Sequence, residues 1–180
     1  MANKNTAVFG IYKSVAQAER AVDTLTTVGF ANNDISVLLT DAQSSHDFAH
    51  EKNTKAPEGT AAGATTGGVI GGALGLLAGI GTLAIPGVGP LIAAGPIIAA
   101  LAGVGAGAAT GGVIGALVGL GIPEYEAKRY EGRVKDGGVL LSVHCSTSKQ
   151  VERAKELLKN TGAEDIASTG EVTSPHAYAR

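Results

Sequence analysis

The pattern of apolar and polar positions predicts a strand and then an amphipathic helix at the start of the chain. Residues 7–13 (AVFGIYK) form a mostly apolar run that favours a strand. Ser14 and Gln17 have the spacing of a capping box, which is typical of a helix start. Apolar residues then recur at intervals of three and four as far as Gly29, where the helix is expected to end. A second apolar, β-branched run at 34–40 predicts a second strand.

The last third of the chain repeats this order after a short charged helix predicted at 124–136. Residues 139–144 predict a strand, and Thr147 and Gln150 form another capping box. A final short strand is expected at 165–169.

These two strand-helix-strand units resemble each other. At an offset of 133 residues, the two helices are identical at six of 13 positions. Two such units are the halves of a ferredoxin-like βαββαβ sandwich, in which both helices cover one face of an antiparallel sheet. The alternative is a chance similarity between two amphipathic helices.

The sequence therefore predicts an α+β fold whose two halves are interrupted by a long insertion. The expected divisions are a first half at 1–43, a polar linker at 44–58, the insertion at 59–123, a second half at 124–172 and a flexible tail at 173–180.

The insertion contains no charged residue over 65 consecutive positions and holds 20 of the 27 glycines. Residues 63–76 and 107–120 are copies of each other that agree at ten of fourteen positions. Turn-forming residues at 86–90 (PGVGP) separate the copies. We expect a Gly/Ala-rich antiparallel helical hairpin.

Each copy carries a ladder of glycines at every fourth position, which would let two helices approach closely along one row. The ladder glycines are expected to mediate helix packing and self-association. They are Gly63, Gly67, Gly71, Gly75 and Gly79 in the first copy and Gly103, Gly107, Gly111, Gly115 and Gly119 in the second.

The length of the expected helices favours a membrane. Helical glycine costs about 0.8–1 kcal/mol relative to alanine in water, whereas lipid enforces helicity. The two helices, at 60–85 and 91–122, would have 26 and 32 residues, more than the ~20 that span a bilayer. The alternative is a homo-oligomer in water whose hairpins bury one another in a central bundle.

Residues beside the base of the hairpin are candidates for a membrane interface. Lys128 and Arg129 agree with a base on the cytoplasmic side, and Tyr125 and Tyr130 would lie near the lipid headgroups. For the two tyrosines, packing onto the sheet is an equal alternative. We thus expect the α+β domain to face the cytoplasm, or the whole protein to be cytoplasmic.

Composition excludes some functions. The net charge of −2 lacks the basic excess that nucleic-acid binding requires. The start of the chain has no pattern of a secretory signal, and the single cysteine, Cys145, fits a reducing compartment.

No motif predicts catalysis, a cofactor or a metal. His46 and His50 have helical ligand spacing but lie in the polar linker, so a solvated linker is favoured over a metal site. His144 and Cys145 are neighbours on a strand and would point to opposite faces, which prevents a nucleophile-base pair. Neither a phosphate-binding glycine motif nor a nucleophile elbow occurs. We expect a protein that is not an enzyme.

A split α+β domain with a glycine-rich apolar insertion resembles the bacterial general stress protein family, including its heat-induced and low-temperature-induced members. The residues that carry the resemblance are 8–12 (VFGIY), 18–21 (AERA), 29–30 (GF), 35–37 (ISV), both GGVIG copies, 125–138 and 139–143 (VLLSV).

The resemblance implies a stress-linked role that supports the membrane or envelope, without a reaction. The layout is also similar to the membrane-anchoring component of quinol-oxidising alternative complexes. We therefore expect a self-associating scaffold with itself, lipid and an unidentified protein as partners, or else an accessory subunit of a membrane redox complex.

Overall fold

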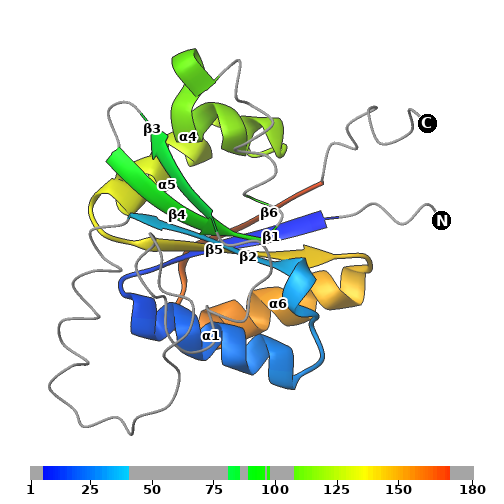
Figure 1. Ribbon diagram of the computed structural model, residues 1–180. Coiled ribbons are helices and arrows are strands. Elements are labelled where there is room, and N and C mark those ends of the chain that lie inside the picture. Colours follow the sequence, from blue (N-terminus) through cyan, green and yellow to red (C-terminus); the bar gives the residue numbers. More distant parts are fainter. Residues whose placement is uncertain (1–5, 41–80, 86–88, 96, 98–107, 171–180) are drawn as a thin grey trace, which may run out of the picture.

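A computed structural model gives the structure of the chain and describes residues 6–40, 81–85, 89–95, 97 and 108–170 (Figure 1). This part contains six strands, four α-helices and one short 3-10 helix, η1 (Asn32–Asp34). The strands are β1 (Thr6–Tyr12), β2 (Ile35–Thr40), β3 (Gly81–Ile85), β4 (Gly89–Ala94), β5 (Val139–Cys145) and β6 (Glu164–Gly170). The helices are α1 (Val15–Thr27), α4 (Ala108–Gly119), α5 (Glu124–Lys135) and α6 (Ser148–Asn160).

The strands form one antiparallel sheet in the order β3-β4-β2-β5-β1-β6. The strands predicted from the two repeated units are neighbours in the order β2-β5-β1-β6. The mixed α+β class is confirmed. The sheet has six strands rather than the predicted four because β4 pairs with β2 and β3 pairs with β4.

Helices cover both faces of the sheet (Figure 1). The strands alternate between the two layers, so Val8 packs towards α1 and α6 while its neighbour Phe9 packs towards α4 and α5. The central strands are therefore apolar at nearly every position, as β5 is over Val139–Cys145.

Local capping signals place α1 and α6 where the sequence predicts them. The Ser14 hydroxyl accepts a hydrogen bond from the Gln17 amide at 3.4 Å. At α6, the Thr147 hydroxyl accepts from the Gln150 amide, and the Gln150 side chain accepts from the Thr147 amide in return, which completes a capping box.

The prediction of two long helices is wrong where the structure describes the insertion. Residues 81–85 and 89–94 form the hairpin β3–β4 instead. Leu91 and Ala93 pack in one layer, whereas Ile92 and Ala94 pack in the other. A continuous apolar run of this kind is typical of a strand that is covered on both faces. Its backbone groups form hydrogen bonds with those of β2. Gly and Pro at 86–90 also oppose a helix.

The second predicted helix is likewise shorter than expected. Of the described residues within 91–122, 91–94 belong to β4, and the helical ones are Ile97 and those of α4. Gly112 breaks α4 with φ 53° and ψ −148°. In the part of the chain that the structure describes, no helix is long and apolar enough to cross a membrane.

Several predicted features lie outside the described residues. They are the linker at 44–58, the tail at 173–180 and seven ladder glycines, namely Gly63, Gly67, Gly71, Gly75, Gly79, Gly103 and Gly107. Gly111, Gly115 and Gly119 lie in α4.

Candidate functional site

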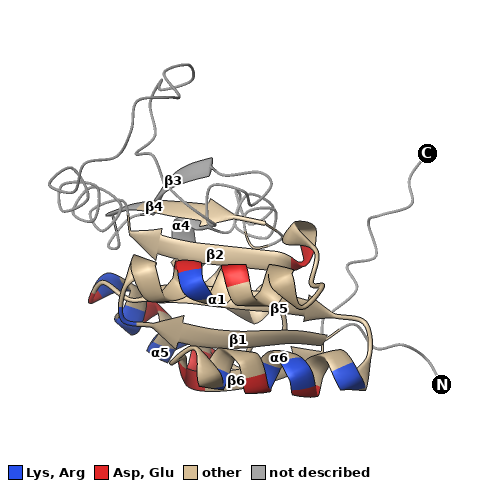
Figure 2. Cartoon of the chain, turned by 90° about the horizontal axis from the view of Figure 1, so that it is seen from below, with Lys and Arg blue, Asp and Glu red and all other residues tan. Residues whose placement is uncertain are grey.

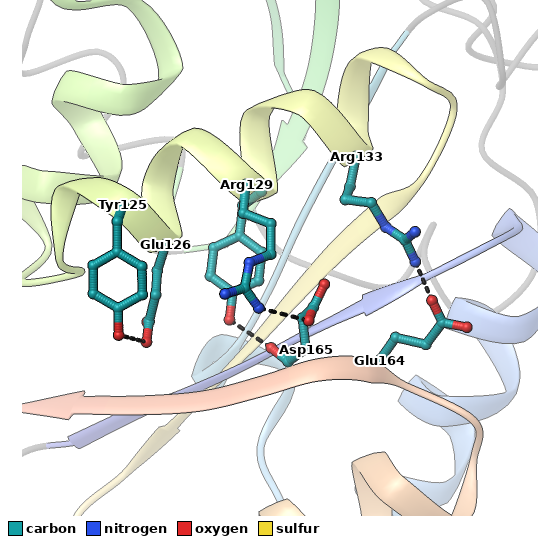
Figure 3. A network of polar contacts seen from close by, with 7 residues as sticks. Tyr125, Glu126, Arg129, Arg133, Glu164 and Asp165 are labelled. Carbon is teal, nitrogen blue, oxygen red and sulfur yellow. Dashed lines mark hydrogen bonds and ion pairs between the residues drawn. The ribbon is translucent and has the colours of Figure 1, made fainter.

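A polar network joins α5 to the start of the edge strand β6 (Figure 3). The Arg129 guanidinium donates to the Asp165 carboxylate at 2.7 Å, and the Tyr130 hydroxyl donates to the Asp165 backbone carbonyl at 2.7 Å. Next to them, Glu164 pairs with Arg133 on α5 and, at 2.7 Å, with Lys13 after β1. The network therefore ties α5, which lies about thirty residues earlier in the sequence, to the start of β6.

Asp165 lies in a β-bulge. Its φ is 49°, a left-handed conformation that residues other than glycine seldom adopt. The β1–β6 register shifts between Phe9 and Ile11, opposite this residue. Arg129 and Tyr130 hold both the side chain and the carbonyl of Asp165, which stabilises the bulge. A bulge flanked by charges protects an edge strand from pairing with another chain.

Tyr130 is buried, with 1% of its surface exposed. Its ring packs against Phe9 with 6.3 Å between ring centroids. Burial raises the pKa of the Tyr130 hydroxyl above its ordinary value. The predicted membrane-interface role is therefore corrected for this residue, since packing onto the sheet leaves no ring surface for lipid.

The other three predicted interface residues are at the surface. Tyr125 is 64% exposed, and its hydroxyl donates to the Glu126 carboxylate. Lys128 pairs with Glu124 at 2.7 Å one helical turn away. Since Arg129 pairs with Asp165, the two cations already have protein partners, and their membrane role stays a prediction.

A hollow of about 220 Å³ lies between α5 and β6, lined by Glu126, Arg129, Tyr130, Asp165, Ile166 and Ala167. Its lining has two carboxylates and one guanidinium, of which Arg129 and Asp165 form an ion pair. Within the described ranges, no three His, Cys, Asp or Glu residues gather as metal ligands. We call Arg129, Tyr130, Arg133, Glu164 and Asp165 the clamp, because their contacts hold the start of β6 to α5.

We expect the ion pairs of Glu164 to make the stability of the fold depend on pH. The hydrogen bond from Lys13 holds the pKa of Glu164 below its ordinary value of 4.5, with a further contribution from Arg133. A lowered pKa adds stability that is present above about pH 4.5 and is lost as the pH falls through the folded pKa.

We expect Glu164→Gln to reduce the fall in melting temperature between about pH 6 and about pH 3, because the variant has no carboxylate to protonate. Thermal unfolding at both pH values measures this effect, and Glu156→Gln on exposed α6 is the control. Equal acid sensitivity of Glu164→Gln and the unsubstituted chain would contradict the expectation. The effect is also expected to shrink in high salt, since the pair is at the surface.

The outer side of α4 forms a second candidate region, which we call the α4 face and define as Gly115, Val118 and Gly119. Val118 is 41% exposed, and a Cβ added at either glycine would meet nothing within 4 Å. The opposite side of α4 is buried through Val113, Ala116 and Leu117. α4 has no charged residue, whereas charged side chains mark the outer surfaces of α1, α5 and α6 (Figure 2).

The remaining sequence candidates do not form a site. His46 and His50 lie outside the described residues. Cys145 packs in the layer of α1 and α6, while His144 lines a small hollow in the other layer, so their predicted opposite orientation is confirmed.

The sequence reasoning missed Glu164 and Asp165. Asp165 lies 35 and 36 residues from its partners Tyr130 and Arg129, so no local spacing marks it. A weak signal exists in the acidic pair at the start of the last strand, a common protection of sheet edges.

Comparison with known proteins gives a family match over part of the chain. Residues 7–86 match the family model described as the heat induced stress protein YflT domain. No curated protein and no solved structure matches the chain. The match supports the resemblance to general stress proteins, and it spans the chain from β1 to the end of β3.

Proposed function

We propose that this chain is a stress-associated scaffold that is not an enzyme and that self-associates through the α4 face. The sheet domain is the rigid part, and its β2-β5-β1-β6 strands with α1 and α6 are a ferredoxin-like unit. The stress association rests on the family match at 7–86. The self-association rests on one observation, the exposed and uncharged α4 face.

The α4 face has the properties of a helix-helix contact. Gly115 and Gly119 are one turn apart, and each has free space where a Cβ would lie, so a second backbone can approach closely along this row. Val118 between them supplies an apolar side chain for burial. The same row on two copies is self-complementary, as a two-fold interface requires.

The two edges of the sheet differ in a way that supports the same assembly region. β6 is protected by the Asp165 bulge and the charges of Glu164 and Arg129. β3 has the uncharged sequence GTLAI and pairs with β4 without a register shift. β3 also contacts α4, so the edge without charges lies beside the helix that carries the α4 face.

Sedimentation of a charge variant tests the proposal. The unsubstituted chain is expected to sediment as an oligomer and Val118→Glu as a monomer at the same concentration. An unpaired charge in an interface costs about 3 kcal/mol, so the dissociation constant should rise roughly 100-fold. Ala16→Glu, on exposed α1, is the control and should remain oligomeric.

A second variant tests whether the α4 helices of two copies are in close contact. Gly115→Leu with Gly119→Leu is expected to keep the far-ultraviolet circular dichroism of the monomer, because both positions are open. It should nevertheless abolish the oligomer, because leucine separates the two backbones.

A monomeric unsubstituted chain would overturn the proposal. If that monomer bound vesicles of phosphatidylethanolamine and phosphatidylglycerol through Val118, lipid would replace the second copy as the partner of the α4 face.

A further inference from the structure

Two buried serines interrupt strands that are otherwise apolar. Ser36 on β2 and Ser142 on β5 are 1% and 6% exposed. They lie directly opposite each other in the β2–β5 register, on the side of the sheet that faces α4 and α5. Apolar residues at both positions would continue the core, so the serine pair needs an explanation.

Ser36 holds the chain as it leaves β4. Its hydroxyl oxygen accepts a hydrogen bond from the Ile97 amide at 3.3 Å. Gly95, with φ +78°, lies so close that an added Cβ would be 2.9 Å from the same oxygen. Ser36 thus contacts both Gly95 and Ile97 where the chain leaves β4.

Ser142 has a different environment. Within the described part of the chain, its hydroxyl makes no hydrogen bond to another residue. A buried hydroxyl without a partner is unfavourable by about 1–3 kcal/mol, so native structures nearly always satisfy it.

Both serines line a hollow of about 20 Å³. One water molecule needs at least about 10–15 Å³ and two to four polar partners. Asp34, directly before β2, and His144 on β5 contribute the other polar groups of the lining. The apolar part of the lining is Ala7, Phe9, Ile97 and Leu120.

We propose that this hollow is a binding site for one ordered water molecule, which accepts a hydrogen bond from the Ser142 hydroxyl and donates one to the Ser36 oxygen. The volume is too small for an organic ligand. A metal ion is disfavoured because neutral hydroxyls are weak ligands and the described residues of the lining include one carboxylate and one imidazole. The water joins β2 to β5 beside Ile97, which Ser36 also holds.

A crystal structure of the full chain at high resolution tests the site directly. We expect density for a water within about 3.2 Å of both serine hydroxyls. A hollow without such density in well-ordered crystals would overturn the proposal.

Thermal unfolding gives an independent test through the sign of the change. With a bound water, Ser142→Ala removes one of its partners and lowers the melting temperature by roughly 2–4 °C. In a dry hollow, the same variant removes an unsatisfied hydroxyl and raises the melting temperature. Ser142→Val, which displaces the water, should also lower it.

The control is Ser168→Ala, at an exposed position of β6, which should leave the melting temperature unchanged. An unchanged or raised melting temperature for Ser142→Ala would overturn the proposal, whatever the oligomeric state of the chain.

Discussion

Gly95→Ala is expected to destabilise the fold by roughly 3–5 kcal/mol, a large share of the total stability of a domain. Gly95 has φ +78°, which an L side chain rarely adopts. The added Cβ would also lie far inside van der Waals contact of the Ile35 carbonyl oxygen and 2.9 Å from the Ser36 Cα. These neighbours are backbone atoms of a central strand and cannot move without breaking the sheet.

Gly29→Ala provides the matched control for Gly95→Ala. Gly29 has φ +102°, but nothing lies within 4 Å of an added Cβ. This variant should lose only about 1–2 kcal/mol of stability, which is the strain of placing alanine in a left-handed conformation. Urea unfolding at one fixed protein concentration measures both variants. Equal losses of stability would show that the close approach of Gly95 to β2 does not exist in solution.

Tyr130→Ala is expected to cost about 3–5 kcal/mol, the usual loss for a buried aromatic residue. It removes the ring that packs on Phe9 and the hydrogen bond to the Asp165 carbonyl. The bulge would lose one of its two contacts with α5, so the end of β6 should exchange amide hydrogens faster.

Tyr130→Phe separates the two contributions. It keeps the ring and removes only the hydroxyl, so a loss of about 1 kcal/mol is expected. Tyr125→Ala, five residues earlier on the same helix, serves as the control because its ring is 64% exposed. Its effect should stay within about 0.5 kcal/mol. A loss at Tyr125 as large as that at Tyr130 would mean that α5 presents its other side to the sheet.

The proposed assembly gives the uncharged stretch a role that does not need a long membrane helix. Its described parts add two strands to the sheet and place α4 against it. If two copies join through the α4 face, the charged surfaces of α1 and α6 on the other side of the sheet remain exposed to solvent (Figure 2). Those surfaces are then available to a partner protein.

The sequence by itself determined the helices and strands that are specified by capping residues and apolar patterns within the same element. The N-cap at Ser14, the capping box at Thr147 and the apolar stripes that follow them specify α1 and α6 within a few residues. The alternating or continuous apolar runs specify β1, β2 and β5. These signals suffice because each one comes from neighbouring residues on one element.

Only the tertiary structure decided the form of the insertion. The run at 91–94 has no amphipathic period, so it fits a buried helix and a buried strand equally well. β2 resolves this ambiguity, because its edge needs hydrogen-bond partners and β4 supplies them.

The same limit applies to the candidate site. The clamp of Tyr130 and Arg129 on Asp165, and the pairing of Ser36 with Ser142, each join residues far apart in the chain. Spacing along the sequence carries no information on such contacts, since the order of the strands and the register of the sheet bring the residues together.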